Sequence, residues 1–233
     1  MRYKIADFIT EYTPRYANLR QLSEPFVYNG DRQTDIELFV TDENLKNTDA
    51  RMAQPDLAKT ENFLYSSAFN RSIIRSGGML VHSSGIICNG AAYLFSAASG
   101  VGKSTHTRLW LRAFGDKVHI FNDDKPVVRL YDNEVIAYGT PFDGGSGIAL
   151  NESAPLKAIV FIERAEENAI RPASSKEIIQ NLYFQTAHMV GAKTAQAMLQ
   201  NFEHLLQSPV RFYILSCNQD IEAAHVAYNS IIE

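Results

Sequence analysis

The segment from residue 97 to residue 105 carries the residue types that bind a phosphate group. It reads Ala97-Ala98-Ser99-Gly100-Val101-Gly102-Lys103-Ser104-Thr105. This differs from the P-loop pattern G-x-x-x-x-G-K-[ST] only at the first position, where alanine replaces glycine. An apolar run precedes the segment and helix-like sequence follows it, which is the context that a P-loop requires. The alternative is an ordinary strand-to-helix turn that happens to contain Gly-x-Gly-Lys-Ser.

Each part of this segment has a role if it binds a nucleotide. Backbone N–H groups of a glycine-rich turn at a helix N-terminus surround a phosphate. The Lys103 amine would lie on the β- and γ-phosphates, and the Ser104 hydroxyl would bind Mg²⁺. ATP and Mg²⁺ are therefore the expected cofactors. The predicted nucleotide contacts are Ala98, Ser99, Gly100, Val101, Gly102, Lys103, Ser104 and Thr105.

A pair of consecutive acids, Asp123 and Asp124, lies twenty residues after Lys103. The pair ends an apolar run at 118–121, which we expect to be a strand adjacent to the strand that enters the loop. One carboxylate can hold Mg²⁺ while the other accepts the proton of an attacking hydroxyl. Alone, the sequence Asp-Asp-Lys-Pro would indicate only a polar turn; together with the loop it favours a functional site.

These motifs resemble the catalytic domain of HPr kinase/phosphorylase and its phosphoenolpyruvate carboxykinase-like relatives. The loop from Ala98 to Ser104 is similar to the family's Asp-Ser-Gly-x-Gly-Lys-Ser, and Asp123-Asp124 to its Ala-Asp-Asp. His82 begins the segment that runs to Lys103, and this segment has the spacing of the family's His-Gly-Val-Leu-Val-Asp segment. The run His82-Ser83-Ser84 also looks like the His-Cys-Ser-Ala of the carboxykinases, in which that histidine is a metal ligand. The resemblance covers about residues 78–165.

The resemblance implies an α/β fold with a P-loop-containing mixed β-sheet core flanked by helices. It also implies catalytic roles for Asp123, His82 and Lys103, with Asp123 as the base, and a metal site of Ser104 and Asp124. Spacing does not decide which aspartate has which role. His82 would contact the transferring phosphate or a second metal ion; a histidine of the core or of a turn is the alternative.

Several positions depart from that family. Thr105 stands where HPr kinases have glutamate, and the first 75 residues are too few for their separate N-terminal domain. Residues 144–148, Gly-Gly-Ser-Gly-Ile, only faintly match the element associated with dephosphorylation. We therefore do not carry the dephosphorylating activity over from the resemblance, and the sequence leaves it open. The chain looks like one of the small stand-alone relatives whose substrates vary.

Two further groups of residues are candidates for substrate contacts. Asp143 and Gly144 belong to a loop of turn-forming residues after a predicted hairpin, and an ordinary turn is an equally good interpretation. Arg164 and Arg171 flank an acidic run and have the geometry to bind phosphate in a bidentate manner. For these two arginines a solvated loop is the simpler interpretation.

Periodicity and turn signals predict alternating strands and helices along the chain. Strands are expected at 3–9, 35–40, 79–82, 91–95, 118–121, 127–131, 135–138, 156–162 and 212–215. Helices are expected at 42–52 after Thr41, at 55–74, at 103–114 before Gly115, at 174–190, at 194–206 and after Asn218. We expect residues 1–75 to form an extension packed on a kinase-like core of residues 76–233.

Composition limits the class of protein. The chain has 233 residues, 45% of them hydrophobic, a net charge of −4 and two cysteines. This is typical of a globular cytoplasmic protein, and we expect no nucleic-acid partner and no membrane partner. The leading hypothesis is a Mg·ATP-dependent kinase that phosphorylates a hydroxyl of an unknown protein or small molecule. A non-catalytic nucleotide-binding accessory or sensor module is the alternative, and the oligomeric state stays open.

Overall fold

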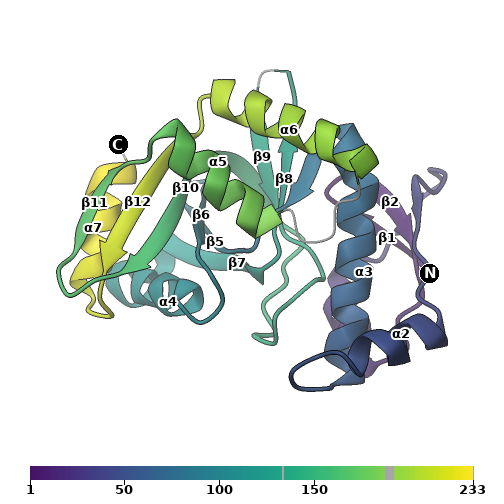
Figure 1. The fold of residues 1–233 in the computed structure, drawn as a ribbon. Coiled ribbons are helices and arrows are strands. Elements are labelled where there is room, and N and C mark those ends of the chain that lie inside the picture. Colours follow the sequence, from purple (N-terminus) through teal and green to yellow (C-terminus); the bar gives the residue numbers. More distant parts are fainter. Residues whose placement is uncertain (133, 187–191, 233) are drawn as a thin grey trace.

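The computed structural model describes residues 1–132, 134–186 and 192–232, and in these ranges a nine-stranded mixed sheet forms the centre (Figure 1). Its strands are β4 (Gly78–Leu80), β5 (Ser83–Cys88), β6 (Ala91–Ser96), β7 (Val118–Asp124), β8 (Val127–Leu130), β9 (Val135–Tyr138), β10 (Ser153–Arg164), β11 (Ala169–Pro172) and β12 (Arg211–Cys217). Paired strands follow the order β4-β8-β9-β10-β6-β5-β7, with β12 also beside β10 and β11 beside β12. The expected mixed sheet is confirmed.

Strand β10 lies at the middle of this sheet. It runs parallel to β6 on one side and to β12 on the other, while its first residues pair antiparallel with β9. Ile159 and Val160, which point to opposite faces, are both fully buried. A strand covered on both faces needs an uninterrupted apolar sequence, and the apolar run at 158–162 is why residues 156–162 were predicted correctly as a strand.

Strand β5 was missed by the sequence analysis, and it corrects the expected strand order. It pairs antiparallel with both β6 and β7, so the strand that carries the two aspartates is not adjacent to the strand that enters the loop. Its start, Ser83-Ser84-Gly85, has no alternating apolar pattern. Gly85 is required there because a Cβ at this position would lie 2.6 Å from the ring of Phe121.

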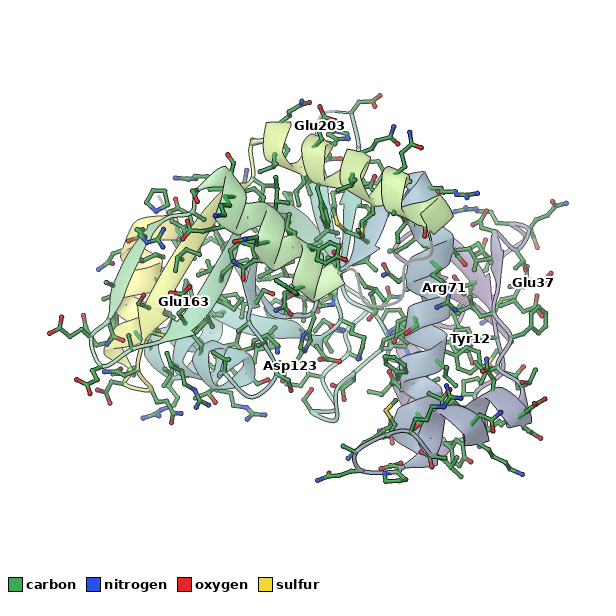
Figure 2. The ribbon with its side chains drawn as sticks, in the orientation of Figure 1. Tyr12, Glu37, Arg71, Asp123, Glu163 and Glu203 are labelled. Carbon is green, nitrogen blue, oxygen red and sulfur yellow. The ribbon has the colours of Figure 1, made fainter. Side chains whose placement is uncertain are left out.

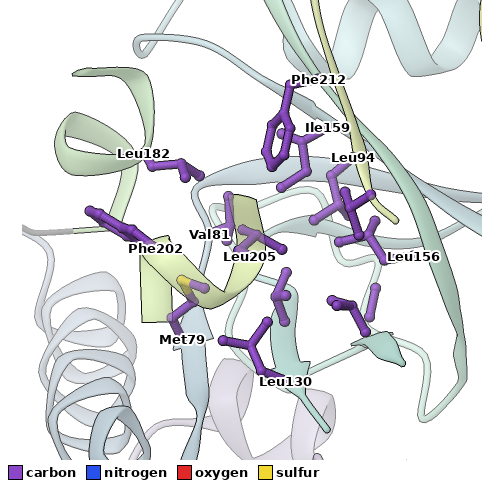
Figure 3. Close-up of a cluster of buried hydrophobic side chains, with 14 of the residues drawn as sticks. Met79, Val81, Leu94, Leu130, Leu156, Ile159, Leu182, Phe202, Leu205 and Phe212 are labelled. Atoms are coloured by element: carbon purple, nitrogen blue, oxygen red, sulfur yellow. The ribbon is translucent and has the colours of Figure 1, made fainter. Parts of the chain in front are cut away.

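Helices cover both faces of the sheet. The helices of this part of the chain are α4 (Lys103–Phe114), α5 (Ser175–Thr186), α6 (Ala192–Gln207) and α7 (Glu222–Ile231), with a 3₁₀ turn η3 (Gly115–Lys117) after α4. One buried cluster joins the sheet to α5 and α6 through Leu182, Phe202 and Leu205 (Figure 3). A second joins it to α4 and α7 around the fully buried Trp110. Within the described ranges, every helix is too short or too polar to span a lipid bilayer.

The first 76 residues form a small sheet and several helices beside this core (Figure 1). The elements are β1 (Arg2–Ile5), β2 (Phe8–Glu11), β3 (Ile36–Glu37), α1 (Ala17–Ser23), α2 (Asp42–Asp49), α3 (Leu57–Ile73) and the 3₁₀ turns η1 (Glu24–Phe26) and η2 (Ile74–Ser76). A third buried cluster unites them with the core, since the ring of Phe69 lies 5.6 Å from that of Phe142. The Tyr138 hydroxyl also donates to Asp7 over 2.7 Å. The division of the chain at residue 75 stays a prediction.

Local sequence signals explain where the N-terminal helices begin. Thr41 caps α2 by accepting a hydrogen bond from the Asn44 N–H, as expected, and Asp56 caps α3 by accepting from Ala58 and Lys59. Gly77, with a φ of 69°, ends the 3₁₀ turn that follows α3.

Three predicted elements differ from the structure. Residues 3–9 are not one strand but the hairpin β1–β2, because Ala6 and Asp7 adopt φ values of 47° and 65°. Residues 35–40 contribute only the two-residue β3. Asn218 does not cap the last helix, because its side chain bonds to Glu166 and Asp220 and α7 begins later. The predicted end of the helix toward 190 lies outside the described residues.

Replacing Phe142 by alanine is expected to lower the free energy of unfolding by about 3–5 kcal/mol, because it removes a fully buried ring between Phe69 and Tyr12. Urea denaturation followed by circular dichroism measures this change. Phe39→Ala is the matched control, since Phe39 is 79% exposed and its loss should cost no more than about 0.5 kcal/mol. Equal values for both variants would show that the shared cluster does not stabilise the fold.

Candidate functional site

The glycine-rich loop, residues 97–102, connects the end of β6 to the start of α4. Gly100 and Gly102 have φ values of 78° and 134°, which residues with a Cβ rarely adopt. The first backbone N–H groups of α4 have no partner within the helix, so they point from its N-terminus toward the site. The side chain of Lys103 is largely buried, and its amine donates to the Ala97 carbonyl over 3.2 Å. Burial lowers the pKa of Lys103, and the carboxylates of Asp124 and Asp123 oppose that effect.

Arg164, at the end of β10, binds the back of this loop. Its Nε donates to the Val101 carbonyl over 3.0 Å, and its Nη2 donates to the Gly100 carbonyl. The guanidinium therefore fixes loop carbonyls instead of lining the cavity described below. Arg171 is bound to Glu177 through two hydrogen bonds, also away from that cavity. The hypothesis that Arg164 or Arg171 binds phosphate in a bidentate manner therefore gains no support.

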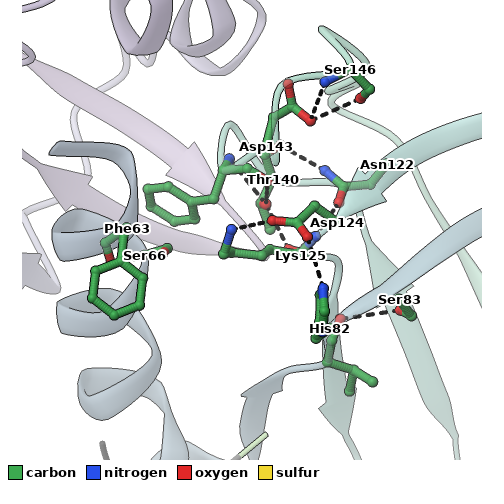
Figure 4. Close-up of polar contacts among 12 residues, drawn as sticks. Phe63, Ser66, His82, Ser83, Asn122, Asp124, Lys125, Thr140, Asp143 and Ser146 are labelled. Atoms are coloured by element: carbon green, nitrogen blue, oxygen red, sulfur yellow. Dashed lines mark hydrogen bonds and ion pairs between the residues drawn. The ribbon is translucent and has the colours of Figure 1, made fainter. Parts of the chain in front are cut away.

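The two aspartates at the end of β7 have different partners. The Ser104 hydroxyl donates to Asp123 Oδ1 over 2.8 Å, and Asp123 is 4% exposed. Asp124 instead lies 3.2 Å from Nε2 of His82 and forms an ion pair with Lys125 (Figure 4). The sequence analysis paired Ser104 with Asp124, whereas the structure brings it to Asp123. Figure 2 shows Asp123 in the context of the whole chain.

His82 is held in place from helix α5. Its Nδ1 lies 2.9 Å from Gln185 Oε1, and its backbone N–H donates to the Gln185 carbonyl. Burial alone would raise the pKa of Asp124, but the hydrogen bond from His82 and the charge of Lys125 hold that pKa well below its usual range. Asp124 is thus an ionised carboxylate with a fixed orientation.

The turn that carries Asp124 is strained and strongly supported. Asp124 has a φ of 150°. Two hydrogen bonds hold the next residue, Lys125, in place: its N–H donates to the Asn122 side chain, and its carbonyl accepts from the Thr140 hydroxyl. Gly144 approaches this turn so closely that a Cβ on it would lie 2.9 Å from Asp124 Cγ. A strained backbone conformation of this kind persists only where several surrounding contacts hold it in place.

Asp143, for which the sequence analysis weighed a substrate contact against an ordinary turn, is not among the residues that line the cavity described below. Its carboxylate accepts hydrogen bonds from the backbone and hydroxyl of Ser146 and from the Gly147 N–H (Figure 4). Asp143 therefore closes its own loop, and this loop presents Gly144, Gly145 and Ser146 to the site.

These groups surround a cavity of ≈ 340 Å³, which we call the phosphate cavity. Its lining residues are His82, Ser99, Gly100, Lys103, Ser104, Arg108, Asp123, Asp124, Gly144, Gly145 and Ser146. Of the predicted nucleotide contacts, Val101, Gly102 and Thr105 instead line a hollow of ≈ 180 Å³ behind the loop, and Ala98 lines neither. Arg108 was missed; its position four residues after Ser104 on one helix face was the available signal.

The acids and the hydroxyl of the phosphate cavity suit a hard cation. Ser104, Asp123 and Asp124 offer oxygen atoms only, which is the ligand type that Mg²⁺ prefers. Within the described ranges, no cluster of three or more His, Cys, Asp or Glu side chains could hold a metal ion by itself. This is compatible with Mg²⁺, which usually binds one or two carboxylates together with phosphates and water.

Comparisons with known proteins give only distant structural similarity. No known family profile matches the sequence, and no curated protein matches it. Among solved structures, the chain is similar to the HPr(Ser) kinase/phosphatase from Coxiella burnetii, with 11% identity and a TM-score of 0.38. That alignment covers 66% of this chain and 96% of the other.

Lys103→Ala is expected to weaken the binding of inorganic phosphate by about tenfold or more, because the amine is a largely buried charged donor in the lining of the cavity. Isothermal titration calorimetry measures the affinity. Lys117→Ala removes an exposed lysine from η3, beyond the C-terminal end of α4, and should leave the affinity unchanged. Equal affinities in the parent and in Lys103→Ala would rule out phosphate binding at this loop.

Arg164→Ala is expected to speed hydrogen exchange at the amides of residues 98–102 by roughly tenfold, because two bonds that fix the loop are lost. Exchange followed by mass spectrometry measures this. Arg171→Ala, which loses an ion pair outside the loop, should leave these amides unchanged. If both variants exchange like the parent, Arg164 does not position the loop.

Proposed function

We propose that this protein is an ATP- and Mg²⁺-dependent kinase that transfers the γ-phosphoryl group to a hydroxyl. The observation that carries the proposal is the hydrogen bond between Ser104 and Asp123. It joins the hydroxyl at the N-terminus of α4 to a buried carboxylate, inside a cavity that also contains Lys103 and a second carboxylate, Asp124. Phosphoryl transfer requires this combination of positioned charges more than it requires covalent chemistry.

The loop and Lys103 would bind the phosphates. Ser99, Gly100 and Lys103 line one side of the phosphate cavity, and the N-terminus of α4 favours negative charge there. The partly desolvated amine of Lys103 would exchange its bond with the Ala97 carbonyl for phosphate oxygens. Arg108 stands at the same cavity and adds a second positive charge.

Ser104 and Asp123 are the residues that would hold Mg²⁺. Their oxygens already lie 2.8 Å apart, whereas Asp124 is engaged with His82 and Lys125. When bound, Mg²⁺ neutralises negative charge on the β- and γ-phosphate oxygens. This assignment exchanges the roles that the sequence analysis gave the two aspartates, an exchange that spacing left open.

Asp124 would then orient the acceptor hydroxyl. Its lowered pKa makes it a weak base, but a carboxylate that stays ionised is a strong hydrogen-bond acceptor. Because phosphoryl transfer has a loose transition state, early removal of the proton is not required. The hydroxyl oxygen bonds to phosphorus, the bond to the β-phosphate oxygen breaks, and the hydroxyl proton leaves by way of Asp124.

A non-catalytic nucleotide-binding module is the second candidate. Ala97 in place of the first glycine, Thr105 in place of glutamate, and the ion pair that already occupies Asp124 favour it. Such a module would bind Mg·ATP without consuming it. The two candidates therefore differ in turnover and not in binding.

Asp123→Asn and Asp124→Asn are expected to fail in different ways. Asp123→Asn should weaken Mg²⁺-dependent ATP binding, since an amide is a poorer ligand for a hard cation. Asp124→Asn should bind Mg·ATP nearly as the parent does but lower ATP turnover by about 10² or more. Calorimetry measures binding, and ATP hydrolysis, with water as the acceptor, measures turnover.

Asp116→Asn is the matched control for this pair, because Asp116 is exposed in η3 and should affect neither quantity. A parent that binds Mg·ATP but never hydrolyses or transfers it would support the module over the kinase. If all three variants bind and turn over ATP like the parent, the Asp-Asp dipeptide is only a turn.

A further inference from the structure

A second hollow of ≈ 210 Å³ adjoins the phosphate cavity. The two share His82 and Asp124, so the bond between these side chains forms part of both linings. Figure 4 shows Phe63 and Ser66 of helix α3 on the side of Lys125 that is away from the Asp143 loop. The second hollow therefore lies between α3 and the carboxylate that would orient the acceptor.

The α3 wall of this hollow is uncharged and preorganised. Phe63, Ser66, Ser67 and Asn70 line it from that helix. The Ser66 hydroxyl donates to the Phe63 carbonyl, and the Asn70 side chain accepts from the Leu80 N–H and donates to the Thr186 carbonyl. These buried polar groups hold the wall in place, and Phe63 and Leu80 supply apolar surface.

The two charges of this hollow neutralise each other. Asp124 and Lys125 are the ionised side chains of this lining within the described ranges, and they pair with each other. The opposite wall, Gln185 and Thr186, is neutral. A charged ligand would lose hydration here and would have to compete with the ion pair between Asp124 and Lys125 for a partner, which is costly in a confined site.

We propose that this hollow is the acceptor site, and that it takes a hydroxyl group on a short, uncharged stem. The inference rests on the proposed kinase function. Its volume is below the about 300–1,000 Å³ of pockets for drug-sized ligands, so it fits one small alcohol or one side chain. The hydroxyl reaches Asp124, attacks the γ-phosphorus of ATP and gives its proton to that carboxylate as ADP leaves.

A filled pocket tests this assignment without touching the proposed catalytic groups. Ser67 is partly exposed on α3, so Ser67→Leu fits the helix while it occupies the hollow. It should raise the KM for the acceptor by at least about tenfold, with Mg·ATP affinity unchanged. Ser72→Leu makes the same change on the exposed side of α3 and should alter neither quantity.

Matched pairs of alcohols test the charge requirement. The parent is incubated with radiolabelled Mg·ATP and either glycerol or glycerate, and separately with either N-acetylserinamide or N-acetylserine. The uncharged member of a pair should be phosphorylated at least about tenfold faster than the charged one. Glycerol represents a free alcohol and N-acetylserinamide a peptide side chain, so the better substrate identifies the source.

The outcomes separate the two proposals. A parent that neither binds nor hydrolyses Mg·ATP overturns the kinase function and the acceptor site together. The acceptor site alone is overturned if ATP is hydrolysed but Ser67→Leu leaves acceptor KM unchanged. It is also overturned if the charged alcohols are phosphorylated faster than the uncharged ones. The same holds if the uncharged alcohols are not phosphorylated and do not slow ATP hydrolysis. Phe63→Ala, which widens the hollow, checks the first result should Ser67→Leu fold poorly.

Discussion

The pairing of β5 with both β6 and β7 is the constraint on which the candidate site depends. Ser84 of β5 lies opposite Phe95 near the end of β6 and opposite Asp123 near the end of β7. The two ladders separate β6 and β7 by about 10 Å, a distance that side chains of α4 must bridge. The Ser84 hydroxyl bonds to Thr107 of α4 over 2.9 Å, which places the start of the helix above β5. Ser104 then reaches Asp123 directly.

The polar groups around this point are stabilised mainly by one another. Lys103, Asp123, Asp124 and Lys125 bring opposite charges together, and buried Asn122 fixes the backbone between them. If one of these groups were removed, its partner would stay buried and unpaired, and the fold would lose more free energy of unfolding than a typical hydrogen bond contributes. The strained positive φ of Asp124 is stabilised in a similar way. Hydrogen bonds to the neighbouring Lys125 prevent the backbone from relaxing to a less strained conformation.

Local sequence signals predicted the elements with strong internal patterns and failed where tertiary pairing decides. Helix α4 begins at Lys103 and ends before Gly115 as expected, and the buried strand β10 was recognised from its apolar run. Strand β5 could not be recognised, because its polar start is buried only by two neighbouring strands and a helix. The partner of Ser104 likewise depends on strand order, which spacing along the chain does not contain. The closed loop of Asp143 is local, and it is the ordinary turn that the sequence analysis named as the alternative.

The cluster shared by the N-terminal elements and the core has a consequence for the order of folding. Phe69 packs against Phe142, and Asp7 is bonded by Tyr131 and Tyr138, so the first part of the chain is completed by residues that follow much later. During synthesis at about 5–20 residues per second, the roughly seventy residues between the two rings take several seconds to appear. Throughout that interval Phe69 of α3 lacks its contact with Phe142, although Phe8, which also packs against its ring, has already been synthesised. Residues 1–76, which are synthesised before the core, therefore reach their native packing only after the core has appeared.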